Sequence, residues 1–179
     1  FFIRYNDALE NLDGLGALTS TGGDFTIDDN DAMTSTSGLS GLETVGSRFF
    51  IRYNDALENL DGLEALTSTG GDFTIDNNDA LTSISGLSGL ETVGSRFYIR
   101  YNDALENLDG LGALISTGGD FTIDDNNVLT SISGLSAFES VGSRVFIRYN
   151  DVLCESDVFA FVSSISIVST VSTADNAGC

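Results

Sequence analysis

The sequence is a tandem repeat, and this repeat restricts the folds that the chain can adopt. Residues 1–48 recur as residues 49–96 with four differences, and a third copy, residues 97–144, follows in the same register. Each unit of 48 residues splits into two related halves of 24, which share the frame F-x-I-x-x-N-x-x-L-x-x-h-x-G-L-x-x-L, where h is apolar. One supersecondary unit must therefore serve at every position along the chain.

Within each half, Phe-x-Ile has the alternation of a strand, whereas the intervals that follow are neither helical nor alternating for long. A coil of this size cannot bury its apolar side chains alone, but stacked coils can. We therefore predict a mainly β fold, a parallel β-solenoid of seven 24-residue coils followed by a C-terminal cap. The inward residues of the first coil, each with an equivalent in later coils, are expected to be Phe1, Ile3, Leu9, Leu12, Leu15 and Leu18.

One asparagine recurs where the chain leaves each strand. Its side-chain amide can bond neighbouring backbone groups and stack one coil on the next, so we predict a structural role. The members of this row are Asn6, Asn30, Asn54, Asn78, Asn102, Asn126 and Asn150.

The series I-x-x-N-x-x-L-x-x-h-x-G-L-x-x-L, repeated six times, resembles the leucine-rich-repeat family. It is most similar to the 24-residue coils of receptor L-domain-like repeats in cell-surface and secreted proteins. It departs from the ordinary leucine-rich consensus in having Phe at the first strand position. The resemblance implies a right-handed parallel β-solenoid used for binding or scaffolding, usually outside the cell, and it implies no reaction.

The frame loosens after Asn150, which divides the chain into a repeat solenoid, residues 1–153, and a C-terminal cap, residues 154–179. Terminal repeats are expected to be atypical because they cover the open end of the core. We expect a degenerate last strand over residues 171–176. The cap residues with the spacing of a short amphipathic helix are Val158, Phe159, Phe161, Val162 and Ile165.

The two cysteines occupy neighbouring frame positions in successive coils, Cys154 in the seventh and Cys179 in the next. Neighbouring strands lie about 4.8 Å apart, and the Cα atoms of a disulfide lie roughly 4.4 to 6.8 Å apart. We therefore predict a Cys154–Cys179 disulfide, with a pair of free buried thiols as the alternative. A disulfide at this place indicates an oxidising compartment, and so an extracellular or cell-surface location.

The chain carries a formal net charge of −20 and contains neither lysine nor histidine. Such a surface repels phosphate backbones and anionic headgroups, so we expect no nucleic-acid partner and no membrane binding. The apolar stretches are too short for membrane insertion of this segment. Without histidine, and without a nucleophile or base that breaks the repeat symmetry, we expect no enzymatic activity and no cofactor.

The outward positions of the strands alternate between two chemistries. In one kind of coil they hold Arg and an aromatic residue, and in the other they hold Asp and Thr. Opposite charges stacked across strands stabilise by roughly 0.2 to 1 kcal/mol per pair, and slipping by one coil would stack like charges. The alternating charge row is Arg4, Asp28, Arg52, Asp76, Arg100, Asp124 and Arg148.

Aromatic residues recur at two outward positions in every second coil, about 9.6 Å apart at the usual strand spacing. Rings in rows beside arginine are typical of a contact surface, although packing against the arginine stems is an alternative. The predicted binding or assembly face consists of Phe2, Arg4, Tyr5, Phe50, Arg52, Tyr53, Tyr98, Arg100, Tyr101, Phe146, Arg148 and Tyr149.

An acidic row follows the asparagine row directly and raises the question of Ca²⁺, which prefers oxygen ligands. No twelve-residue Ca²⁺ loop or glycine-rich nonapeptide occurs, and turn aspartates more often accept local backbone bonds, so we predict no metal site. Threonine-rich stretches such as residues 19–21 do not recur as outward pairs on every coil, which disfavours ice binding. The acidic row is Asp7, Asp31, Asp55, Asp79, Asp103, Asn127 and Asp151.

These observations predict a non-enzymatic, extracellular structural or adhesive solenoid. Because near-identical units suit an array whose length matters, we expect it to be part of a longer array or filament. Its expected partners are copies of itself, assembled end to end or laterally, or an extracellular protein or glycan. The alternative is a receptor-like ligand-binding module that presents the aromatic face.

Overall fold

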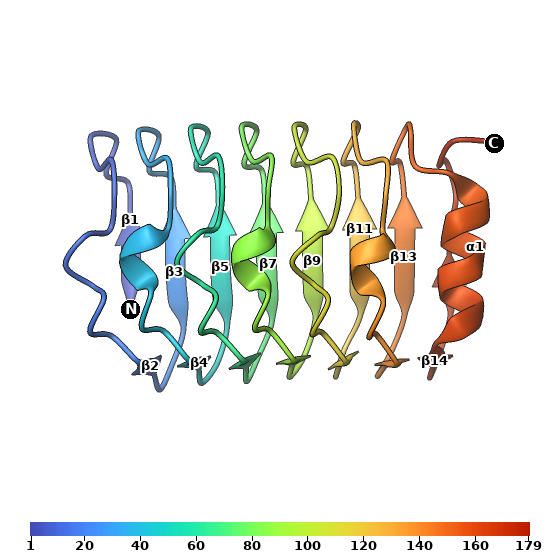
Figure 1. Ribbon diagram of the computed structural model, residues 1–179, viewed down its shortest axis with the longest axis horizontal. Coiled ribbons are helices and arrows are strands. Elements are labelled where there is room, and N and C mark those ends of the chain that lie inside the picture. Colours follow the sequence, from blue (N-terminus) through green and yellow to red (C-terminus); the bar gives the residue numbers. More distant parts are fainter.

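The computed structural model describes all residues, 1–179, and shows a mainly β, parallel β-solenoid, which confirms the predicted fold class (Figure 1). One strand from each coil joins an eight-stranded sheet in which every pairing is parallel. In the order of the sheet its strands are β1 (Phe2–Arg4), β3 (Phe25–Asp28), β5 (Phe49–Arg52), β7 (Phe73–Asp76), β9 (Phe97–Arg100), β11 (Phe121–Asp124), β13 (Val145–Arg148) and β15 (Val171–Ser172).

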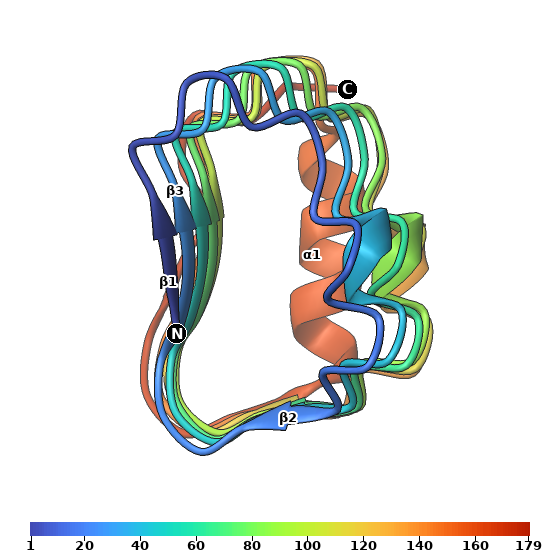
Figure 2. The ribbon, with the colours of Figure 1, turned by 90° about the vertical axis from the view of Figure 1, so that its left-hand side faces the viewer.

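A second parallel sheet, which the sequence analysis did not predict, forms another wall of the coils (Figure 2). Its seven strands have two residues each, so they are too short for an alternating pattern to be visible in the sequence. They are β2 (Ser20–Thr21), β4 (Thr44–Val45), β6 (Ser68–Thr69), β8 (Thr92–Val93), β10 (Ser116–Thr117), β12 (Ser140–Val141) and β14 (Ser166–Ile167). Every second coil also carries a 3₁₀ turn opposite the large sheet: η1 (Ser37–Leu39), η2 (Ser85–Leu87) and η3 (Ser133–Leu135).

The predicted inward residues form one continuous hydrophobic core through the stack, with the exception of Phe1. Phe1 is 49% exposed because no coil precedes it in the structure, so its predicted burial is wrong. Phe25, Phe49, Phe73 and Phe97 are fully buried, and their rings stack at centroid distances of 4.9 to 5.2 Å. This distance is close to the strand spacing, so each ring packs face to face on the same residue of the next coil.

The asparagine row joins successive coils, as predicted. Asn54 Nδ2 donates to the carbonyl oxygens of Arg52 and Ile27, at 2.9 and 3.3 Å, and to Asn78 Oδ1 at 3.2 Å. Asn54 Oδ1 accepts from the backbone N and Nδ2 of Asn30. Asn176 extends the row beyond the seventh coil by accepting from the backbone N and Nδ2 of Asn150. Each coil is thereby fixed to the next through buried amide groups.

Two glycines show why the Gly-Leu position excludes side chains. Gly62 has a φ of +95°, a conformation that side chains rarely adopt. A Cβ at Gly86 would collide with the carbonyl group of Leu60 in the preceding coil. A Cβ at Gly62 would also lie within 2.7 Å of the backbone of Ser37, so the frame needs glycine for close approach in both coils and for backbone conformation at Gly62.

The C-terminal segment covers the end of the core, with helix α1 (Glu155–Ser164) lying opposite the large sheet (Figure 2). Val158 is buried, and Phe161, Val162 and Ile165 pack against the core. The predicted helix is correct in place, but Phe159 does not belong to its apolar face, because 55% of the residue is exposed. The last strand is also shorter than predicted, since only Val171 and Ser172 pair with β13.

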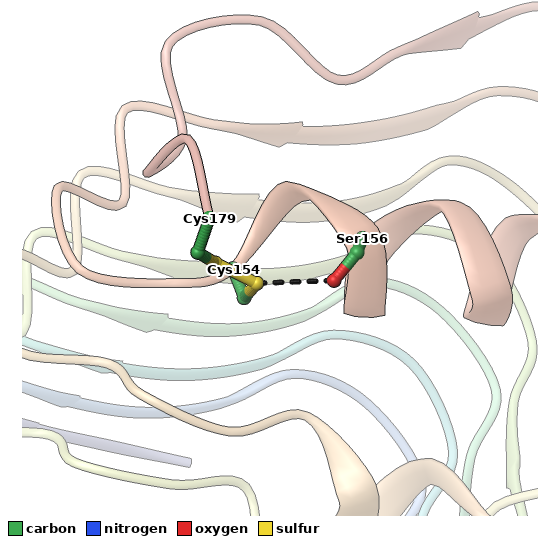
Figure 3. The surroundings of a disulfide bond; sticks show 3 residues. All are labelled: Cys154, Ser156 and Cys179. Atoms are coloured by element: carbon green, nitrogen blue, oxygen red, sulfur yellow. Dashed lines mark hydrogen bonds between the residues drawn. A yellow bond between two sulfur atoms is a disulfide. The ribbon is translucent and has the colours of Figure 1, made fainter.

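The predicted disulfide is confirmed. Cys154 immediately precedes α1, and its bond to Cys179 joins the chain end to the start of the helix, with the Cα atoms 5.6 Å apart (Figure 3). Cys154 Sγ also lies 3.1 Å from the hydroxyl of Ser156. Helix α1 has ten residues, and no helix in the structure is long and apolar enough to span a bilayer.

We expect Asn54→Ala to lower the free energy of unfolding by about 3 kcal/mol or more, because it leaves several buried donors and acceptors unpaired, each costing about 1–3 kcal/mol. Asp55→Ala, at the exposed neighbouring position, should change it by less than about 0.5 kcal/mol. Urea unfolding followed by circular dichroism measures both. Equal effects of the two substitutions would contradict the role of the asparagine row.

Candidate functional site: the outer face of the large sheet

The charge row of the large sheet has the predicted register. Arg52 lies opposite Asp28 and Asp76, and Arg100 lies opposite Asp76 and Asp124. Arg52 and Arg100 form ion pairs with the aspartate of the preceding coil, at 3.0 and 2.7 Å. Arg4, in the first coil, lies 3.8 Å from Asp28 of the following coil. The row thus consists of Arg–Asp ion pairs between adjacent coils, with Asp28 shared between Arg4 and Arg52.

A second set of ion pairs lies where the chain enters the strands. The Arg48 side chain donates to both carboxylate oxygens of Asp24, and Arg144 does the same to Asp120, at 3.1 and 2.7 Å. The hydrogen bonds from Arg48 lower the pKa of Asp24, and those from Arg144 lower the pKa of Asp120 to about 2. These bidentate pairs stabilise the ionised carboxylates in the folded protein.

Burial has the opposite effect on the pKa of Asp76 in the charge row. Asp76 is buried on the outer side of the sheet, and this burial raises the pKa of its carboxyl group despite the neighbouring Arg100. Asp28 and Asp124 are buried in the same way. The sequence analysis placed these aspartates on the accessible face, and that expectation is wrong because side chains of adjacent coils cover them.

The first aromatic row consists of Phe2, Phe50, Tyr98 and Phe146. Its rings, with the arginines beside them, cover the buried aspartates. Phe50 and Tyr98 are half-buried, and the guanidinium groups of Arg52 and Arg100 lie 4.8 Å from the respective ring centroids. Phe146 lies between Arg144 and Arg148, at 5.1 and 4.9 Å. Thr26, Thr74 and Thr122 lie opposite these rings. They were expected to be accessible at outward strand positions, but they are buried. Rings, arginines and aspartates therefore pack against one another here, while Asp28 Oδ1, Arg52 Nε, Arg100 Nε and Thr122 Oγ1 are buried without a hydrogen-bond partner.

The second aromatic row, which we call the tyrosine row, is exposed in every coil that carries it, whereas the first row is exposed only at Phe2 in the first coil, where 62% of the residue is accessible. Tyr53, Tyr101 and Tyr149 are 45%, 45% and 44% exposed, and Tyr5 in the first coil is 73% exposed. Arg148 lies 5.6 Å from the centroid of the Tyr149 ring, whereas no cation lies over the rings of Tyr53 or Tyr101. The row follows the outer edge of the large sheet, one ring for every two coils.

The backbone of the tyrosine row is in the left-handed conformation, with φ values of +53° to +58°. In the alternate coils the same position holds Asp29, Asn77, Asp125 and Asp175, which are also left-handed. Asp and Asn tolerate this conformation, but a bulky side chain there costs about 1–2 kcal/mol. The sequence analysis missed this constraint, although the Asp and Asn of the alternate coils were a signal of it.

The acidic row lies beside the tyrosine row and is exposed. No group of three or more Asp, Glu or Cys side chains is arranged to hold a metal ion. The Asn127 side chain donates to Asp103 at 2.9 Å, so an amide interrupts the row of carboxylates there. Burial and the charges of neighbouring aspartates raise the pKa values of Asp29 and Asp125.

The surface has three shallow clefts, and none of them brings two side-chain carboxylates together. The cleft between α1 and η3 has an apolar floor that includes Leu135, Phe138 and Phe161, with Asp157 as its one titratable side chain. The cleft along β10, β12 and β14 has no titratable side chain. The cleft at the first coil contains Asp13. None of the three clefts therefore contains two side chains that could act as general acid and general base.

Comparison with known proteins identifies no relative: no protein-family model matches the sequence, and no curated protein or solved structure is significantly similar to it.

We expect the stability contributed by the Asp120–Arg144 pair to be lost in acid. The folded-state pKa of Asp120 is about 2, below its ordinary value of 3.8, so the contribution is complete above about pH 5 and declines as the pH falls towards 2. At pH 7, Asp120→Asn should lower the unfolding free energy by about 1–2 kcal/mol, and this difference should shrink near pH 2. Urea unfolding at several pH values tests this.

The matched control for this experiment is Asp61→Asn. Asp61 is exposed and its side chain makes no hydrogen bond, so its substitution should have little effect at any pH. A difference between wild type and Asp120→Asn that stays constant from pH 7 to pH 2 would contradict the assignment.

Proposed function

We propose that the protein is a non-enzymatic structural and adhesive solenoid of the extracellular space or cell surface, and that it attaches to other material through the tyrosine row. The observation that carries this proposal is the exposure of tyrosines in a left-handed conformation, which costs free energy that the Asp and Asn of alternate coils avoid. Strained residues of this kind concentrate at functional positions.

The rest of the outer face of the large sheet supports the assignment of the contact role to the tyrosine row, because its side chains already contact one another. Arg52, Arg100 and Arg148 are engaged with aspartates and with aromatic rings, so Phe50, Tyr98 and Phe146 offer less free surface to a partner. The tyrosine row is exposed and aromatic, and Tyr combines a large contact area with a polar hydroxyl group, a combination common in binding surfaces.

Two further features support the extracellular and non-enzymatic parts of the proposal. The Cys154–Cys179 disulfide fits an oxidising compartment, and the shallow clefts lack paired acid–base groups. Within this proposal the coils are a variant of the leucine-rich repeat of the receptor L-domain-like kind. A receptor-like module that binds one soluble ligand through the same row is the alternative within the same site.

The test replaces tyrosine with the residue that the alternate coils already use. Asn77 occupies the equivalent left-handed position, so Tyr53→Asn with Tyr101→Asn should leave the unfolding free energy unchanged or raise it by about 1 kcal/mol. We expect the wild-type protein to be retained on at least one of cellulose, chitin, starch and collagen-coated beads. The double variant should lose that retention, measured as depletion from solution.

The control is Asp61→Asn, which removes an exposed charge outside the tyrosine row and keeps both rings. It should bind like the wild type. Retention of the double variant at the wild-type level, or no retention of the wild type on any of the materials, would reject the proposed contact role.

A second candidate function, assembly with other copies of the chain, is favoured by the C-terminal cap. Phe159 and Val168 are 55% and 77% exposed, and β15 is an edge strand, which can pair with another chain. We expect filaments or oligomers of the wild type in electron microscopy and sedimentation at high concentration. Phe159→Glu with Val168→Glu should disperse them, whereas the tyrosine variant should still assemble. Short separate rods of the wild type would argue against assembly.

A further inference from the structure

We infer that the tyrosine row binds an extended, uncharged β-1,4-linked polysaccharide, such as a glucan or an N-acetylglucosamine polymer. This inference rests on the contact role proposed above and specifies the chemical class of the partner. It follows from the spacing of the rings, from what lies between them and from the charge of the surrounding surface.

The spacing is set by the sheet. Tyr53 and Tyr101 follow β5 and β9, which are separated by one strand, β7. At the usual distance between strands the two positions lie about 9.6 Å apart along a straight row. An extended β-1,4-linked chain has a two-residue repeat of nearly the same length, so every second sugar ring can lie over a tyrosine.

The alternation along the row also matches such a chain. Successive pyranose rings of an extended β-1,4-linked chain are turned over relative to one another, so that only every second ring presents the same face. The protein alternates in the same period, with an aromatic ring in one coil and a hydrogen-bonding side chain, Asn77 or Asp125, in the next. An α-1,4-linked chain curves and loses this register after a few residues.

The chemistry of the row suits a neutral sugar. The C–H bonds of a pyranose ring carry partial positive charge and pack on the negative face of an aromatic ring. The faces of Tyr53 and Tyr101 have no guanidinium group over them, unlike those of Phe50 and Tyr98. Exposed Asp55 and Asp103, two residues farther along each coil, are acceptors for sugar hydroxyl groups.

The charge of the protein excludes anionic polysaccharides, the other large class of extracellular polysaccharide. The chain carries a net charge of −20, and its arginines in the sheet are engaged with aspartates. A polysaccharide with carboxylate or sulfate groups would meet the acidic row beside the tyrosines and would be repelled. The occupant is therefore uncharged.

The experiment titrates soluble oligosaccharides into the intact protein by calorimetry or NMR. Cellohexaose or chitohexaose should bind more than tenfold more tightly than maltohexaose, and more than tenfold more tightly than the corresponding disaccharide, which reaches only one tyrosine. Tyr53→Asn with Tyr101→Asn should weaken hexaose binding more than tenfold, whereas Asp61→Asn, outside the tyrosine row, should bind like the wild type. Circular dichroism confirms that each variant is folded.

The outcomes separate the two proposals. Equal affinity for β- and α-linked hexaoses, or no affinity for either, rejects the polysaccharide class. The contact role then stands if the double variant loses retention on another material such as collagen, and both proposals fail if that retention is unchanged. Tighter binding of an anionic polysaccharide than of the hexaoses would also reject the inference.

Discussion

The hydrogen bonds of the asparagine row determine how the rest of the molecule is arranged. Because Asn54 accepts from Asn30 and donates to Asn78, each coil is held directly against the next, with no freedom to shift along the strand. Residues at the same frame position therefore form straight rows, one strand spacing apart. The stacked phenylalanines of the core, the ion pairs and the tyrosine row all follow from this alignment.

The alignment also explains why the repeat unit is two coils long. Inside the solenoid, like side chains can stack on one another, as Phe49 does on Phe73, because apolar surfaces attract. On the outside, stacked arginines would repel and stacked large rings would compete for the same space. Alternation places Arg52 over Asp28 and Phe50 opposite Thr26, so a large or charged residue always meets a small or opposite one.

The features that could be predicted from the sequence depend on a single coil: the inward Phe and Ile residues, the turn asparagine and the cysteine positions. The second sheet escaped prediction because two-residue strands such as Ser68–Thr69 carry no periodic signal. Burial of Asp76 depends on covering side chains from adjacent coils, which a strand pattern does not show. The exposure of Phe159 depends on how α1 is placed against the core, since helical spacing alone allowed it to face inward.

The tyrosine row is the place where local preference and sequence disagree. The fold requires a left-handed residue before each asparagine, and Asn77 shows that this requirement is met without an aromatic side chain. The copies have diverged elsewhere: Phe50 corresponds to Tyr98, and Phe49 corresponds to Val145 in the seventh coil. Tyrosine nevertheless occupies all four odd coils, with its ring exposed. The tyrosine row, which the backbone disfavours and the core does not use, is therefore the basis of the contact role proposed above.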